Sequence, residues 1–120
     1  MLIISAIIAA VMKRLVYLVL KQSPDVFGVL DEIRKDGYNA TVVSTESLHH
    51  ALDDAPEDKH FFNLRHIEEM AKQESMLCLF VVDEDKVEHL KQVIRANTNH
   101  FTLVKGFMFS RPIEDFEGSI

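Results

Sequence analysis

The sequence has almost no means of covalent cross-linking. Its 120 residues include a single cysteine, Cys78, which lies inside the apolar run MLCLFVV. One cysteine cannot form an intramolecular disulfide, so we expect a fold held by a hydrophobic core in a reducing, cytoplasmic environment. Within that run we interpret Cys78 as a small buried hydrophobic residue.

The sequence also lacks an excess of positive charge. Its formal net charge is -6, and its basic residues form no continuous stripe. Proteins that bind nucleic acids neutralise phosphates with clustered lysine and arginine side chains. We therefore expect no nucleic-acid partner.

Signatures of catalysis are absent from the sequence as well. There is no glycine-rich GxxxxGK loop and no serine in a nucleophile-elbow setting. The adjacent carboxylates Asp53 and Asp54 lie in a predicted loop, with no apolar pocket in evidence that would separate their pKa values. We predict that the protein is not an enzyme; a small enzyme subunit or a structural subunit is an alternative that no pattern favours.

No apolar run has the length of a membrane span, which needs about 20 residues. The longest, MLIISAIIAAV at residues 1–11, precedes Lys13 and Arg14, whereas a signal peptide carries its charges first. We interpret residues 1–11 as an apolar N-terminal extension upstream of a natural start at Met12, with a short membrane anchor as the alternative. If present, the extension should form a loose helix outside the core of a single domain, residues 12–120.

What the chain does contain is a repeated strand–helix–strand pattern. Continuous apolar runs predict strands, and apolar residues at helical spacing predict helices. Ser23, Pro24 and Gly37 are typical of the start and end of the first helix, and Asp83 of the start of the second. The predicted elements are a strand at 15–20, a helix at 24–36, a strand at 40–45, a strand at 76–82, a helix from 84, and a strand at 101–109.

The two halves of this pattern are equivalent. A shift of 61 positions places Val26 on Val87 and Ile33 on Ile94. Two such units predict an α+β, ferredoxin-like split β-α-β sandwich, with a four-stranded antiparallel sheet and both helices on one face. Because the runs LVYLVL and LCLFVV are apolar at every position, the uncovered face should be buried by oligomerisation.

A long insert, residues 46–75, separates the second and third strands. We expect a loop followed by an amphipathic helix over residues 61–73. The loop carries His49, His50 and several acids, and residues 46–60 have a net charge of -4. Adjacent histidines diverge on a helix and on a strand, so they are interpreted as solvated residues, with weak metal binding or catalysis as alternatives.

The order of five segments resembles the PII-like signalling proteins, relatives of the nitrogen regulatory protein PII. The resemblance covers about residues 12–118. The segments are KRLVYLVLK, ATVVSTESL, FFNLRHI, LFVVDEDKVEHLKQVI and KGFMFSRPIEDFEG.

The resemblance implies a homotrimer whose sheets face inward and a small-molecule effector bound in the clefts between subunits. It places residues 46–75 at the T-loop, which contacts a target protein, a membrane transporter being one candidate. Thr45, Glu46, Lys105, Gly106 and Arg65 are then the predicted ligand-binding residues. The alternative roles are a solvent-facing strand residue for Lys105 and a strand bulge for Gly106.

Three features depart from PII. The family binds adenine nucleotides through a GDGK loop and an R-x-R segment; the chain has TNHFTLVKG and the acidic IEDFEGSI. The T-loop tyrosine is also missing. The chain therefore lacks the motif that would bind the phosphates of an adenine nucleotide. Such a nucleotide stays a candidate, and the cofactor stays unknown. A CutA-like trimer that binds a divalent metal through His49 and His50 is the alternative function.

Overall fold

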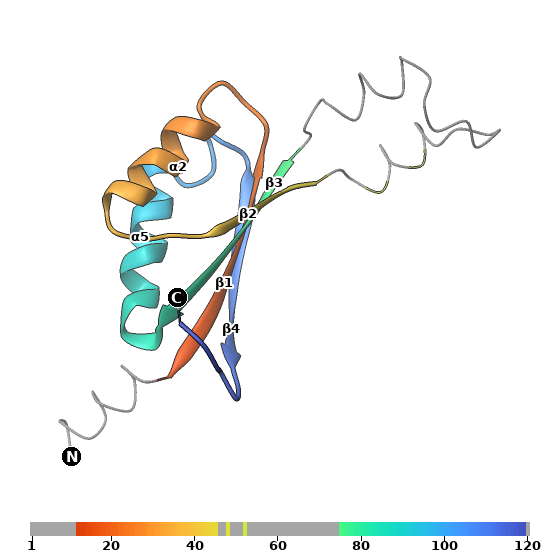
Figure 1. Cartoon of the computed structure of the whole chain (residues 1–120). Coiled ribbons are helices and arrows are strands. Elements are labelled where there is room, and N and C mark those ends of the chain that lie inside the picture. Colours follow the sequence, from red (N-terminus) through yellow and green to blue (C-terminus); the bar gives the residue numbers. More distant parts are fainter. Residues whose placement is uncertain (1–11, 46–47, 49–51, 53–74, 120) are drawn as a thin grey trace.

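A four-stranded antiparallel sheet forms one layer of the protein, and two helices form the other (Figure 1). The computed structural model describes residues 12–45, 48, 52 and 75–119. The strands are β1 (Lys13–Lys21), β2 (Thr41–Thr45), β3 (Ser75–Asp83) and β4 (Gly106–Ile113). The helices are α2 (Val26–Lys35) and α5 (Val87–Thr98), with the short 3-10 turn η1 (Glu84–Lys86) before α5.

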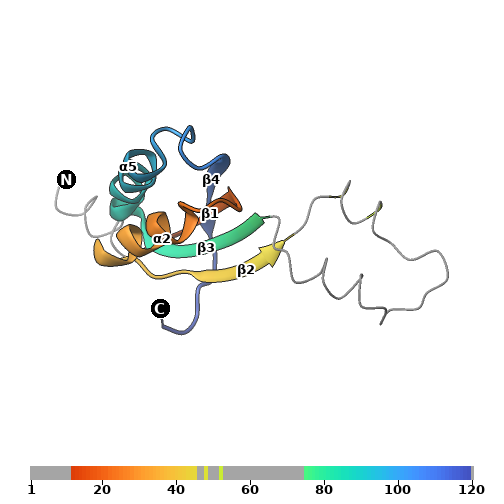
Figure 2. The ribbon, with the colours of Figure 1, turned by 90° about the horizontal axis from the view of Figure 1, so that it is seen from above.

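The strand order is β2-β3-β1-β4, and both helices cover the same face of the sheet (Figure 2). The predicted α+β, ferredoxin-like fold is confirmed. The predicted N-terminal extension and the helix over residues 61–73 lie outside the described residues. Since β3 begins at Ser75, the connection between β2 and β3 is one residue shorter than predicted.

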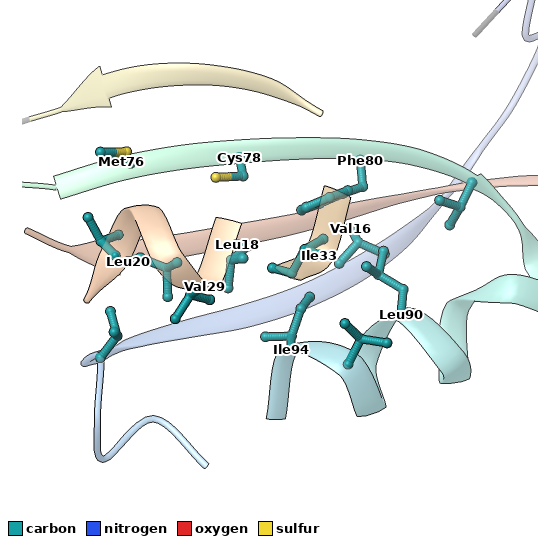
Figure 3. Close-up of a cluster of buried hydrophobic side chains, with 14 of the residues drawn as sticks. Val16, Leu18, Leu20, Val29, Ile33, Met76, Cys78, Phe80, Leu90 and Ile94 are labelled. Carbon is teal, nitrogen blue, oxygen red and sulfur yellow. The ribbon is translucent and has the colours of Figure 1, made fainter. Parts of the chain in front are cut away.

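The core lies between the sheet and the helices (Figure 3). Alternate residues of β1 and β3 point to the helices, as the two-residue period of a strand requires. The buried apolar residues are Val16, Leu18, Leu20, Val26, Val29, Ile33, Met76, Cys78, Phe80, Val82, Val87, Leu90, Val93, Ile94 and Val104. Cys78 is fully buried, as predicted.

The two helices bury equivalent residues of the internal repeat. Val26 and Ile33 of α2 are buried, and so are their equivalents in α5, Val87 and Ile94. Each helix thus presents the same stripe to the sheet, which explains why a pattern of weak identity gives two matching halves.

The end of α5 and the start of β4 differ from the prediction. The sequence pattern predicts a strand at 101–109, but Asn99, His100 and Phe101 are left-handed, with φ of 50°, 54° and 60°. This turn ends α5 and directs Val104 into the core, so that β4 begins only at Gly106. β4 then continues through Pro112, which an edge strand tolerates because one side of its backbone needs no partner.

The start of α2 is shifted by two residues. The Ser23 hydroxyl accepts a hydrogen bond from the Asp25 N–H at 3.2 Å, and the Ser23 carbonyl accepts one from the Val26 N–H at 3.3 Å. Ser23 therefore organises the turn before the helix, while Pro24 lies in that turn and not at the first helical position.

Candidate functional site

The predicted ligand-binding residues that the structure describes lie at one end of the sheet, where the chain leaves for the insert (Figure 1). Thr45 is the last residue of β2 and pairs with Ser75 of β3. Ser75 pairs in turn with Lys21, the last residue of β1. The backbone N–H of Lys21 donates to the carbonyl of Lys105 at 2.8 Å. A continuous row of residues therefore crosses the sheet at this end.

The row brings together two lysines and two hydroxyls. Lys21 and Lys105 are exposed neighbours, while Thr45 and Ser75 are half-buried neighbours. Ammonium groups and hydroxyls both donate hydrogen bonds, so the row can bind an acidic or carbonyl-bearing molecule. Lys21 and Ser75 were not predicted, because only the strand pairing places them next to Lys105 and Thr45.

Thr45 and Lys105 nevertheless lie on opposite edges of the sheet. Adjacent strands are about 4.8 Å apart, so three spacings separate these two residues by about 14 Å. A single chain therefore does not bring them into contact around a small molecule. A cleft that uses both residues needs the edge of a second subunit.

Gly106 has a structural reason for being glycine. It pairs with Leu20 as the first residue of β4, and a Cβ at this position would lie 1.9 Å from the carbonyl oxygen of Val19. The pairing of β1 with β4 runs without interruption from Gly106 to Ile113, so the strand bulge that was the alternative role of Gly106 is not present. Gly106 lets the Lys105 segment lie against the end of β1.

Four of the predicted site residues, Glu46, Arg65, His49 and His50, lie outside the described residues. Within residues 12–45, 48, 52 and 75–119, no three histidine, cysteine, aspartate or glutamate side chains gather as metal ligands. The predicted metal ligands His49 and His50 are not among these residues, so metal binding by them stays a prediction.

The face of the sheet away from the helices is apolar, as predicted. The strand register gives two rows across this face, Val43–Leu77–Val19–Phe107 and Thr41–Leu79–Tyr17–Phe109. The rings of Tyr17 and Phe109 stack with their centroids 4.5 Å apart. Phe107 and Phe109 remain 55% and 48% exposed. We call this set of eight residues the open face.

Polar contacts fix the other end of the sheet. Lys13 at the start of β1 forms an ion pair with Asp83 at the end of β3. Arg14 donates to Glu84 at 3.3 Å and to Ser110 at 3.4 Å. Asp83 was predicted to cap the second helix; its carboxylate makes no capping hydrogen bond and binds Lys13 instead.

Comparisons with known proteins leave the family open. No family model matches the chain, and no curated protein is significantly similar to it. The resemblance to PII-like proteins therefore stays a prediction. In the described part of the chain, no helix is long and apolar enough to span a membrane.

Proposed function

We propose that the protein is a PII-like trimeric regulator. In this proposal three chains associate through the open face, a small-molecule effector binds in the clefts between subunits, and residues 46–75 contact a target protein. The observation that carries the proposal is the open face, an apolar surface on a sheet whose other face is the one that the helices cover.

Exposure of the open face to water is unfavourable. Monomeric proteins rarely expose contiguous apolar patches larger than a few hundred Å². Phe107, Phe109 and Val43 each keep about half of their surface exposed, at 55%, 48% and 45%. Burial against other subunits removes this surface from water, which stabilises the assembly at about 25 cal/mol for each Å² of apolar area.

A closed ring also supplies the second edge that the candidate site needs. In a cyclic trimer each interface joins two different surfaces of the subunit. If the sheets face inward, the β2 edge of one subunit approaches the β4 edge of the next. Thr45 of one chain then comes close to Lys105 of its neighbour, at the end where the insert leaves the sheet.

The effector is best described by its chemistry. Lys21 and Lys105 favour a molecule with an acidic group, and Thr45 and Ser75 add hydroxyl donors. An adenine nucleotide is one candidate, but its phosphates lack the loop that PII proteins use. The single free cysteine agrees with the proposed cytoplasmic location.

The first test is the mass of the assembly, measured by native mass spectrometry on the wild-type chain and two variants. Phe109→Glu places a charge on the open face, beside Tyr17, and should give monomers. Phe27→Glu is the matched control, since Phe27 is 62% exposed but belongs to α2, on the other side of the sheet. It should keep the wild-type mass of three chains.

The same spectra identify what the assembly binds. A retained organic ligand that Lys105→Ala abolishes would support the effector site. Bound zinc or copper that disappears on replacing His49 and His50 with alanine would support the CutA-like function instead. A wild-type chain that stays monomeric at micromolar concentration would overturn the proposed assembly.

A further inference from the structure

The C-terminal tail, residues 114–119, turns back over the sheet at the end opposite to the insert. β4 ends at Ile113, which pairs with Lys13 of β1. From there the tail brings Phe116 near the ammonium of Lys13, 5.8 Å from the ring centroid. Figure 2 shows the tail on the side of the sheet that faces away from the helices.

The backbone of the tail is bent at two positions. Asp115 and Gly118 adopt left-handed conformations, with φ of 52° and 108°. The second bend brings Ser119 to the start of β2, so the tail spans the sheet from one edge strand to the other. The rest of the open face, toward the insert, is left uncovered by the tail.

A cavity of about 270 Å³ lies between the tail and the sheet. This volume is just below the range of about 300–1,000 Å³ that is typical of sites for drug-sized molecules, so the cavity suits a smaller ligand. Leu79 and Val81 of β3 line it together with the aromatic ring of Phe116. Its remaining lining residues are Asn39, Ala40, Thr41 and Ser119.

The polar groups of the cavity are neutral. Asn39, Thr41 and Ser119 contribute an amide and two hydroxyls, and no described lining residue is ionisable. The Asn39 side-chain oxygen accepts a hydrogen bond from the Ala40 N–H at 2.9 Å, which directs its NH₂ group to other acceptors. The cavity therefore combines an aromatic ring and an aliphatic floor with hydrogen-bonding groups along one wall.

The charges around the cavity disfavour anions. The tail carries Glu114, Asp115 and Glu117 and no basic residue. Lys13 is already paired with Asp83, and Arg111 lies two strands from Val81, on the other side of Leu15. A cation would also lose its hydration in a cavity whose described lining offers no carboxylate, at a large cost in free energy.

We propose that this cavity is a second binding site, for an uncharged planar molecule with an amide-like edge. The ring of the ligand packs between Phe116 and the side chains of Leu79 and Val81, and its amide bonds Asn39, Thr41 and Ser119. The tail forms the outer wall of the site. The site lies at the opposite end of β2 from Thr45, under the tail. It shares Thr41 and Leu79 with the open face, but all of its groups come from one chain, so it needs neither a second subunit nor the proposed effector to form.

The test uses two pairs of probes that differ only in charge. Benzamide and nicotinamide are titrated into the full-length ¹⁵N-labelled protein, and benzoate and nicotinate are the matched anions. The amides should shift the backbone signals of Ala40, Thr41, Leu79 and Ser119, and the carboxylates should bind at least about tenfold more weakly. Equal binding of amide and carboxylate, or no shift with either amide, would overturn the proposal.

A pair of phenylalanine variants tests the role of the tail. Phe116→Ala removes the aromatic wall and should weaken amide binding by at least about tenfold. Phe27→Ala on α2 removes an exposed ring far from the cavity and should leave binding unchanged. Because Phe116 lies at the surface, its replacement should not affect folding, which the dispersion of the same spectra checks. Binding that persists in Phe116→Ala would contradict the site.

Discussion

Gly106 is the residue at which β4 comes closest to the backbone of β1. A Cβ there would lie 1.9 Å from the Val19 oxygen and 3.0 Å from the Val19 carbonyl carbon. Both neighbours are backbone atoms, so no side-chain rotation can relieve the contact. The two strands must separate locally if any other residue occupies this position.

We therefore predict that Gly106→Ala lowers the free energy of unfolding by at least about 1–3 kcal/mol, the usual cost of overpacking. Gly28→Ala is the control. Gly28 lies inside α2, and a Cβ added there would meet nothing within 4 Å, so alanine should stabilise the helix by about 0.5–1 kcal/mol. Urea unfolding of both variants measures the difference; a neutral Gly106→Ala would disprove the close approach.

Cys78 makes a second residue-scale prediction. Burial raises the pKa of its thiol from 9.0 to about 11, because the thiolate would lose its hydration. The folded state therefore holds the proton more tightly than the unfolded state. This contribution to stability is complete below pH 9 and is lost as the pH rises from about 9 to 11.

Two measurements check the thiol. A thiol reagent at pH 8 should label Cys78 slowly in the native protein and rapidly in urea, since only unfolding exposes the sulfur. Between pH 9 and 11 the free energy of unfolding should fall less in Cys78→Ala than in the wild type, because the variant has no thiol to ionise. All other groups titrate equally in the two proteins. Identical pH profiles for the two proteins would contradict a buried thiol.

At the scale of single elements, the end of α5 depends on one buried hydroxyl. Thr98 is fully buried, and its hydroxyl donates to the Ile94 carbonyl at 2.7 Å. The same oxygen accepts from the N–H of Phe101 at 3.1 Å, inside the left-handed turn. The side chain thus satisfies a backbone group that the end of the helix would otherwise leave without a partner.

Thr98→Val keeps the shape of the side chain but removes both hydrogen bonds. It should lower the free energy of unfolding by about 1–3 kcal/mol, because the Phe101 N–H loses its partner. Thr98→Ser is the matched control, since it keeps the hydroxyl and removes only a methyl group. If thermal unfolding ranks serine as the more destabilising substitution, packing and not hydrogen bonding holds the turn.

At the scale of the whole molecule, stability and association should be coupled. If the open face is buried in a trimer, folding of each chain and assembly share the same free energy. The wild-type Tm should then rise with protein concentration, because dilution favours dissociated chains. The Tm of Phe109→Glu should stay constant over the same range. Scanning calorimetry at several protein concentrations measures this. A wild-type Tm that is independent of concentration would show that the protein is a monomer.

The elements and their buried faces follow from the sequence alone. Strand alternation and helical spacing are local patterns, so they predict the stripe from Val26 to Ile33, its repeat from Val87 to Ile94, and the two-sided apolar strands without knowledge of any contact. The start of β4 was missed for a local reason too. Asn99, His100 and Phe101 adopt left-handed conformations without a glycine to signal them.

Which distant residues meet depends on the tertiary structure. Strand order and register place Lys21 beside Lys105 and Ser75 beside Thr45, although these pairs are separated by many residues in the chain. The same is true of Phe116, which no pattern directs to the face that carries Leu79. Such contacts depend on pairing between strands and on the path of the tail, neither of which is encoded by a local periodicity.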